Sequence, residues 1–213
     1  MPELRQYGLY ALGAVLVVFM LRRNLWRFLL FLKPTALKLE ADAPADQMKL
    51  PGFLERRQSE LLTLGFVPLG THLERAPLGA QTLAFDFGHP KELVFATLTA
   101  SDEQPRLYLL SRSQAGFVLT ADYRRPAREL KGRYLSGSLE GVSAERLYKA
   151  HLRRLAELGP ATGECTLEGR LAAARAWLEG PGASETRQQN LLGLLWTVGT
   201  VGMVAAAILG RRS

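Results

Sequence analysis

The chain has 213 residues and a formal net charge of +7, from 27 Lys and Arg against 20 Asp and Glu. Residues 41–186 are neutral, so the excess positive charge lies near the two ends. This distribution argues against a nucleic-acid-binding domain, which concentrates basic charge on a folded surface, and it is typical of charge that flanks membrane segments. A single cysteine, Cys165, excludes an internal disulfide.

The first 33 residues predict a membrane helix. Residues 7–21 form an uncharged apolar run, and Arg22, Arg23 and Arg27 follow it. Because arginine is costly at the centre of a bilayer, these side chains are expected to lie near the headgroups. We therefore predict a transmembrane helix with an interfacial extension over residues 4–33. A cleaved signal peptide is the alternative, although Arg22 and Arg23 stand where its small cleavage-site residues should be.

The middle of the chain predicts one α+β domain over residues 51–180, after a linker at 34–50. The domain should begin with a helix that is capped by Gly65. Beyond it, apolar residues alternate with polar ones in short segments, which predicts an antiparallel β-meander of five or six strands. The expected strands lie at 82–87, 93–99, 106–111, 116–122 and 133–139.

Two further helices are expected after the meander. Ser143 can cap a helix that ends at Leu158, and Thr166 can cap one that ends at Leu178. Both carry an apolar stripe at helical spacing, so we expect them to cover the same face of the sheet. The run Gly180-Pro181-Gly182 should end the second helix, and residues 181–189 are expected to be a linker.

A second transmembrane helix is predicted over residues 190–210. Leu191–Leu209 holds no charge, and at about 1.5 Å per residue it nearly matches the ~30 Å hydrocarbon core of a bilayer. A buried helix in a soluble core is the alternative. Small residues at helical spacing form a stripe on this helix, and they are expected to pack against another helix within the chain or in a homo-oligomer. The stripe consists of Gly199, Gly202, Ala206 and Gly210.

Basic residues close to the apolar ends predict the orientation. More of them stand on the side of the central domain than on the side of the two tails, which favours a cytoplasmic central domain. The Ala-, Leu- and Arg-rich composition is typical of GC-rich bacterial genomes. We therefore expect a two-pass protein of a bacterial inner membrane.

No catalytic, cofactor or metal motif stands out. The three histidines and Cys165 lack the close pairing of zinc sites. Asp86-Phe87-Gly88 matches a kinase triplet, but the other kinase motifs are absent. His151 falls within the apolar stripe of its helix, which indicates a hydrogen-bonded core histidine or a pH-responsive contact. No cofactor or nucleic acid is expected as a partner.

One segment is strongly basic. Residues 124–133 contain a single acid and five basic side chains, which are Arg124, Arg125, Arg128, Lys131 and Arg133. A solvated loop is the simplest interpretation. The functional interpretation is contact with the anionic headgroups of the lipid bilayer.

These features favour a non-enzymatic binding or regulatory module at the membrane surface, with an unknown protein partner. One alternative is a pocket between the meander and its helices that senses or transfers a lipid or small apolar ligand. Its candidate liners are Phe85, Phe87, Phe95, Phe117 and Leu119, although each is also suited to core filling. A weaker alternative is a membrane-bound enzyme whose site is assembled only by the fold.

Overall fold

The computed structural model describes residues 2–101 and 104–209, and it leaves the side chains of residues 2–11, 101 and 208 undescribed. The chain divides into two compact units. The helical unit contains the two long terminal helices and residues 76–80. The mixed unit contains residues 38–75 and 81–182.

The helical unit is built from α1 (Pro2–Leu32) and α5 (Pro181–Leu209), with the short η1 (Pro34–Ala36) after α1. In the part of the chain that the structure describes, one helix, residues 181–207, is long and apolar enough to cross a membrane. The C-terminal segment is therefore a candidate membrane helix. The second crossing expected at residues 4–33 is helical in the structure, but its passage through a membrane stays a prediction.

The two long helices contact each other at Gly193. A Cβ added to Gly193 would stand 2.2 Å from the Cβ of Arg27, so any side chain there would collide with it. The buried positions of α5 near this contact are Asn190, Thr197 and Thr200, which share one helix face with Gly193. The absence of a side chain at Gly193 therefore lets α5 approach α1 closely at this point.

The predicted small-residue stripe lies elsewhere on α5. Gly199 and Gly202 are exposed, with no other atom within 4 Å of an added Cβ, and Ala206 is exposed too. Gly210 lies outside the described residues. Gly199, Gly202 and Ala206 do not pack against α1, so the packing of the stripe in a homo-oligomer stays a prediction.

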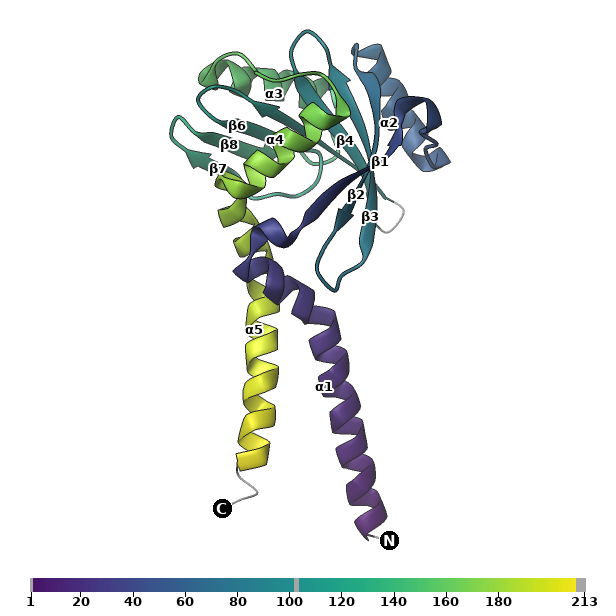
Figure 1. The fold of residues 1–213 in the computed structure, drawn as a ribbon, viewed down its shortest axis with the longest axis vertical. Helices are drawn as coiled ribbons and strands as arrows, with labels where there is room; N and C mark the ends of the chain where they lie inside the picture. Colours follow the sequence, from purple (N-terminus) through teal and green to yellow (C-terminus); the bar gives the residue numbers. More distant parts are fainter. Residues whose placement is uncertain (1, 102–103, 210–213) are drawn as a thin grey trace. The chain divides into compact units, whose positions relative to one another are not determined.

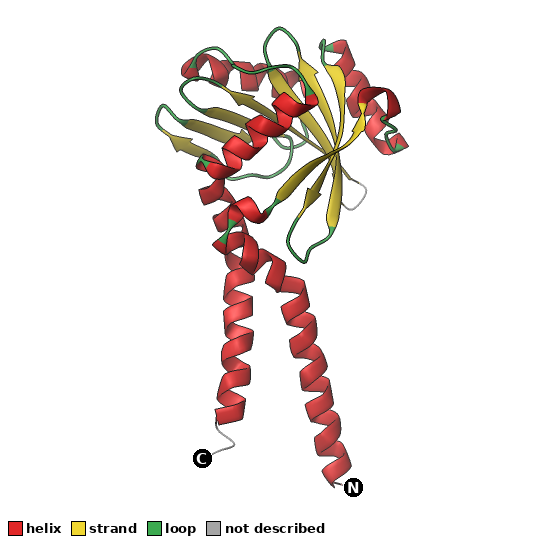
Figure 2. Ribbon diagram, in the orientation of Figure 1, coloured by secondary structure: helices red, strands yellow, loops and turns green. Residues whose placement is uncertain are grey.

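The mixed unit is organised around one eight-stranded sheet with the order β1-β2-β3-β4-β5-β6-β8-β7 (Figure 2). The strands are β1 (Lys38–Pro44), β2 (Val67–Arg75), β3 (Gln81–His89), β4 (Val94–Ser101), β5 (Gln104–Arg112), β6 (Phe117–Ala121), β7 (Arg128–Leu130) and β8 (Tyr134–Ser138). The α+β class is confirmed, and the meander is present from β1 to β6 with antiparallel neighbours.

Two details of the predicted sheet were wrong. The sheet has eight strands instead of five or six, because β1 lies in the expected linker 34–50 and β7 lies in the basic segment. The chain turns back through β7 before β8, so β8 runs parallel to β6. β1 was missed because it is an edge strand whose residues are mostly exposed, and such a strand shows no apolar alternation.

The helices of the mixed unit are α2 (Gly52–Thr63), α3 (Ala144–Leu158) and α4 (Leu167–Glu179), with η2 (Ala45–Gln47) before them. Their predicted ends are confirmed. Ser143 Oγ accepts a hydrogen bond from the Arg146 amide, and Thr166 Oγ1 accepts one from the Gly169 amide. Gly65 follows α2 with φ +90°, a conformation that glycine adopts without strain.

The expected linker at 181–189 is also wrong. α5 begins at Pro181, so Gly180 alone separates it from α4. Proline is well suited to the first position of a helix, because the amide hydrogen that it lacks would have no partner there. Gly180-Pro181-Gly182 therefore ends one helix and starts the next.

The sheet has two covered faces (Figure 1). α2 and α3 cover one, here called the α3 face, and α4 crosses the other, here called the α4 face. The expectation that α3 and α4 share a face was wrong. The α3 face holds a continuous apolar core that includes Leu54, Phe85, Phe87, Leu98, Leu107 and Leu147. Strand alternation sends the neighbouring residues to the α4 face, where several are polar.

Candidate functional sites

A buried group of polar side chains lies on the α4 face, here called the Asp86 cluster. Sheet register builds most of it, because Asp86 is paired with Thr97, and Thr97 with Tyr108, across β3, β4 and β5. β2 contributes His72, and α4 contributes Arg170. The side chains of His72, Asp86, Thr97 and Arg170 are fully buried, and Tyr108 is half-buried.

Asp86 is the centre of this cluster. His72 Nδ1 donates a hydrogen bond to one carboxylate oxygen, Oδ2. Thr97 Oγ1 donates to the other, Oδ1, at 2.6 Å, and Arg170 Nε lies 3.2 Å from that same oxygen. The carboxylate therefore has one hydroxyl and two cationic neighbours, which is the pairing that a buried charge requires.

Arg170 connects α4 to the sheet. Its Nε donates to Thr97 Oγ1 at 3.0 Å, and its Nη2 donates to the Tyr108 hydroxyl at 2.5 Å. The guanidinium carbon lies 5.5 Å from the centre of the Tyr108 ring, within cation–π range. One side chain of α4 therefore holds residues of β3, β4 and β5.

The partners within the cluster shift the pKa values of Asp86 and His72 in opposite directions. Burial alone would raise the pKa of Asp86, but Arg170 and His72 outweigh burial and lower it. Burial alone would lower the pKa of His72, but hydrogen bonds to Asp86 and Glu74 outweigh burial and raise it. The contacts of the cluster therefore favour the charged forms of both Asp86 and His72.

The Asp86 cluster is suited to structure and not to catalysis. A histidine hydrogen-bonded to a carboxylate is also the arrangement of a general base, but such a base must reach a substrate. His72 and Asp86 have no exposed surface. Among the residues that the structure describes, no group of three His, Cys, Asp or Glu side chains is placed to hold a metal ion.

The α3 face contains its own buried histidine. His151 Nδ1 is hydrogen-bonded to Thr120 Oγ1 at 3.1 Å, and its Nε2 to Ser111 Oγ at 3.0 Å. Burial, with a smaller contribution from the charge of Arg154, lowers the pKa of His151 to about 3. The side chain is therefore a neutral, hydrogen-bonded part of the core, and its role as a pH-responsive contact stays a prediction.

The basic segment forms one edge of the sheet, here called the basic edge. It comprises β7 and the loops at its two ends. Arg124, Lys131 and Arg133 are exposed, whereas Arg125 and Arg128 are half-buried. The Arg125 guanidinium lies 5.4 Å from the centre of the Trp177 ring. Three of the five predicted contact residues therefore extend into solvent, and the other two also pack against the fold.

The remaining predicted membrane-contact residues are on α1. Arg22, Arg23 and Arg27 are exposed, and the Arg27 guanidinium lies 5.1 Å from the centre of the Trp26 ring. An arginine beside a tryptophan is typical of the interface between headgroups and acyl chains. The contact of these residues with a membrane stays a prediction.

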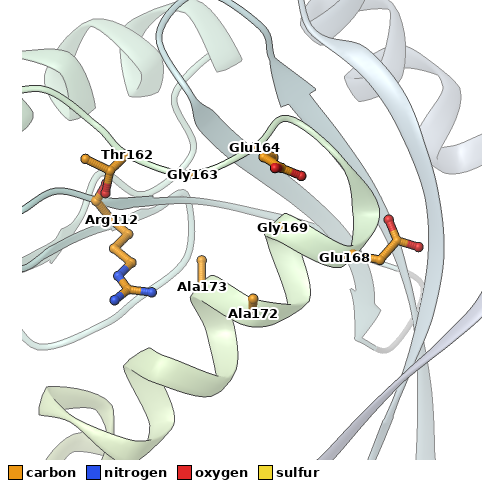
Figure 3. A pocket seen from close by; sticks show the side chains of 8 residues that line it. All are labelled: Arg112, Thr162, Gly163, Glu164, Glu168, Gly169, Ala172 and Ala173. Carbon is orange, nitrogen blue, oxygen red and sulfur yellow. The ribbon is translucent and has the colours of Figure 1, made fainter.

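A hollow of about 480 Å³ lies beside the first turn of α4 (Figure 3). Its polar lining includes Arg112, Glu164 and Glu168, but Glu168 points away from Arg112. Small residues of α4, among them Ala172 and Ala173, form the floor. Because the charged groups do not converge on one point, the hollow offers no pair of groups that would act together on a substrate.

The five candidate pocket liners do not share a face. Phe85 and Phe87 belong to the core of the α3 face. Phe95 and Leu119 alternate to the α4 face and are buried there, and Phe117 is half-buried. These positions fill the two layers of the mixed unit and do not surround one common space.

A second pocket, here called the edge pocket, has a volume of about 320 Å³ and lies beside β7. Residues of β7, β8, α3 and the loop before β7 line it. They are Ala127, Arg128, Glu129, Leu135, Ser136, Arg154 and Glu157. The sequence indicated the basic segment but not this pocket, because Arg154 and Glu157 come from a helix that follows it in the chain.

No protein-family model, curated protein or solved structure matches this chain.

Proposed function

We propose that this chain is an integral membrane protein whose mixed unit is a non-enzymatic binding and regulatory module at the membrane surface. The observation that carries the proposal is the direct connection between α4 and α5. α5 contains the candidate membrane span, Gly180 alone separates it from α4, and Arg170 fixes α4 to the sheet. A short, structured connection of this kind keeps the module close to the membrane that α5 enters.

The basic edge is the surface that we propose for contact with the membrane. Arg124, Lys131 and Arg133 are exposed along it. Each basic side chain close to an anionic surface contributes roughly 1 kcal/mol of attraction. This attraction falls off within about 10 Å at 0.1 M salt, so a tethered module benefits from it much more than a freely diffusing one.

We further propose two crossings, by α1 and α5, in a bacterial inner membrane. The basic residues beside the apolar segments favour a cytoplasmic mixed unit. The cytoplasmic leaflet carries anionic lipids, and it would therefore attract the basic edge. Arg22, Arg23 and Arg27 would contact the same headgroups from α1.

The test uses the full chain in lipid nanodiscs. We expect hydrogen exchange in residues 123–134 to slow when phosphatidylglycerol replaces phosphatidylcholine, and the protection to fade at high salt. Replacing Arg124, Lys131 and Arg133 by Ala should abolish the difference between the two lipids.

The control variant replaces three exposed basic residues away from the basic edge, Lys49, Lys91 and Arg146, by Ala. It removes the same net charge and should keep the lipid-dependent protection. If both variants lost the lipid-dependent protection equally, the overall charge, and not the basic edge, would determine the contact with the membrane.

A further inference from the structure

The hairpin that joins β2 to β3 has an apolar tip, residues 76–80, here called the hairpin tip. These five residues belong to the helical unit. Their sequence, Ala-Pro-Leu-Gly-Ala, contains no charged or polar side chain. Leu78 is 74% exposed, the highest value among the large apolar residues that the structure describes. The hairpin tip therefore presents a leucine to the surroundings of the helical unit.

The exposure of Leu78 is similar to that of apolar residues on the two long helices. Leu12 on α1 and Met203 on α5 are 67% and 65% exposed. In the mixed unit, no large apolar side chain that the structure describes is more exposed than Leu130, at 48%. Large apolar surface that the protein leaves uncovered marks a contact with a membrane or another protein. Leu78 therefore resembles the apolar residues of the long helices and not those of the mixed unit.

The turn at the hairpin tip holds Leu78 in a conformation that favours other residue types. The Gly79 amide donates a hydrogen bond to the Ala76 carbonyl oxygen at 3.1 Å, which closes a β-turn with Pro77 and Leu78 at its centre. Leu78 has φ +58°, and glycine or asparagine normally occupies this left-handed region. Because local turn chemistry does not select leucine here, the conflict points to a role of its side chain outside the turn.

The hairpin tip lies against Trp26 of α1. A Cβ added to Gly79 would stand 3.6 Å from Cδ2 of Trp26, which is an ordinary van der Waals distance. The next residue of α1, Arg27, contacts α5 at Gly193. Gly193 is the third residue of the charge-free run Leu191–Leu209, within the candidate membrane span. Trp26 and the hairpin tip therefore lie close to the level at which the charge-free run of α5 begins.

We propose that the hairpin tip enters the interfacial layer of the bilayer and that Leu78 inserts among the acyl chains. Tryptophan, the residue type beside the tip, is enriched at this level of membrane proteins. The tip carries no charge that would oppose insertion, and transfer of an apolar side chain from water to lipid is favourable. Lipid is therefore the partner that covers Leu78.

This inference rests on the proposed function, because the hairpin tip can insert only where α5 enters a membrane. β2 and β3 continue from the tip into the mixed unit, so an inserted Leu78 would tether that unit to the membrane at a third point besides α1 and α5. The contact differs from that of the basic edge in its lipid requirement. Apolar insertion needs no anionic headgroup, whereas electrostatic attraction does.

The test places an environment-sensitive NBD fluorophore on single cysteines of the full chain in nanodiscs of phosphatidylcholine. Cys165→Ser provides the background, and Leu78→Cys, Leu62→Cys and Val198→Cys provide the three labelled positions. Leu62 is an exposed residue of α2, and Val198 lies in the candidate span. We expect doxyl-labelled lipid to quench the labels at positions 78 and 198 by about half or more, and the label at position 62 by less than about a tenth.

The three positions separate this inference from the proposed function. Quenching at position 198 without quenching at position 78 would overturn insertion of the hairpin tip and leave the proposed membrane span standing. Absence of quenching at position 198 would overturn both. Equal quenching at positions 78 and 62 would show that the fluorophore partitions into lipid from any exposed site, and it would overturn the assignment to the tip.

The charge of the lipid separates the hairpin tip from the basic edge. Quenching at position 78 should stay the same when phosphatidylglycerol replaces phosphatidylcholine, and also when Arg124, Lys131 and Arg133 are replaced by Ala. Loss of quenching at position 78 in the triple variant would contradict an independent apolar contact. Failure of the basic edge alone would leave the quenching at position 78 intact.

Leu78→Asn tests the leucine without a label. Asparagine tolerates the φ of +58° at this position, so the variant keeps the turn and removes the apolar side chain. Hydrogen exchange of residues 78–81 in nanodiscs should become about fivefold faster or more, because water then reaches the hairpin tip. Leu62→Asn is the control, and it should leave exchange in this segment unchanged. Equal exchange in Leu78→Asn and the unaltered chain would overturn the proposal.

Discussion

The two faces of the sheet each bury a histidine, and they shift the pKa values of these histidines in opposite directions. His72 on the α4 face and His151 on the α3 face are both fully buried. His72 contacts two carboxylates and has a raised pKa, whereas His151 contacts two hydroxyl groups and has a lowered one. The comparison shows that the partners of a buried group, and not burial alone, decide its charge.

The two faces also differ in the contacts that hold the helices covering them. α3 is held mainly by apolar contacts in the core of its face. α4 is held in addition by the ion pair and hydrogen bonds of Arg170. Since α4 leads directly into α5, the charged face is the one connected to the candidate membrane span.

Removing Arg170 should have the largest effect. Arg170→Met leaves Asp86 buried with fewer cationic partners, and breaking a buried ion pair costs about 3–5 kcal/mol of unfolding free energy. Pulse proteolysis of the full chain in urea and detergent measures this loss. The control is Arg175→Met, which removes one exposed arginine of the same helix. It should cost about 1 kcal/mol, for its hydrogen bond to the Leu39 carbonyl oxygen. Equal losses of unfolding free energy in the two variants would show that the contacts of Arg170 in the cluster stabilise the fold no more than those of an exposed arginine.

Lowering the pH should reduce the free energy of unfolding through His151 on the α3 face. Its folded-state pKa lies below that of the unfolded chain, so between about pH 6.5 and 3 the unfolded state binds the extra proton. Stability should then fall by roughly 1.4 kcal/mol for each pH unit below 6.5 from this group. His151→Gln can still hydrogen-bond but cannot titrate, and it should flatten that part of the pH profile. An unchanged slope would contradict a neutral His151.

Within the Asp86 cluster, His72 should respond to pH in the opposite direction to His151. The folded-state pKa of His72 is raised, so the stability that it contributes is complete below about pH 6.5 and is lost as the pH rises through the folded-state pKa. Asp86, whose pKa is lowered, contributes stability above about pH 3.8 that is lost as the pH falls through its folded-state pKa. His72→Gln should remove the loss on the alkaline side. If His72→Gln leaves the alkaline side unchanged, His72 is not protonated.

The helix caps should have the smallest effects, and they should be alike on the two faces. Ser143→Ala on α3 and Thr166→Ala on α4 should each cost about 1 kcal/mol, because each removes the acceptor of a first-turn amide. Ser59→Ala is the control, since its hydroxyl is exposed on α2, and it should cost less than about 0.5 kcal/mol. If the two variants lost very different amounts of unfolding free energy, the difference between the faces would lie in the helix ends and not in the side chains beneath the helices.

Sequence patterns predicted the elements that obey local rules. Apolar alternation and capping residues located most strands of the sheet and the ends of α3 and α4. Residues 38–44 were missed because an exposed edge strand has no alternation to detect. The prediction that α3 and α4 cover the same face was wrong. Two helices with similar apolar stripes give no indication of which face of the sheet each will cover.

The Asp86 cluster was not predicted, although one signal was present. Arg170 falls within the apolar stripe of its helix, between Leu167 and Ala174, just as His151 does in α3. A charged residue in such a position needs a buried partner. The sequence does not identify that partner, because Thr97 is 73 residues away and only the fold brings it close.

Both faces of the sheet are covered by helices, so the account assigns the contact with the membrane to the basic edge. The most direct test is photo-crosslinking of the full chain in its native membrane from a benzoylphenylalanine placed at Leu130 or at Leu62. The two leucines are similarly exposed, at 48% and 44%, but Leu130 is on β7 and Leu62 is on α2. The account predicts lipid adducts from position 130 and few from position 62. Equal labelling of the two positions, or labelling from Leu62 alone, would contradict it.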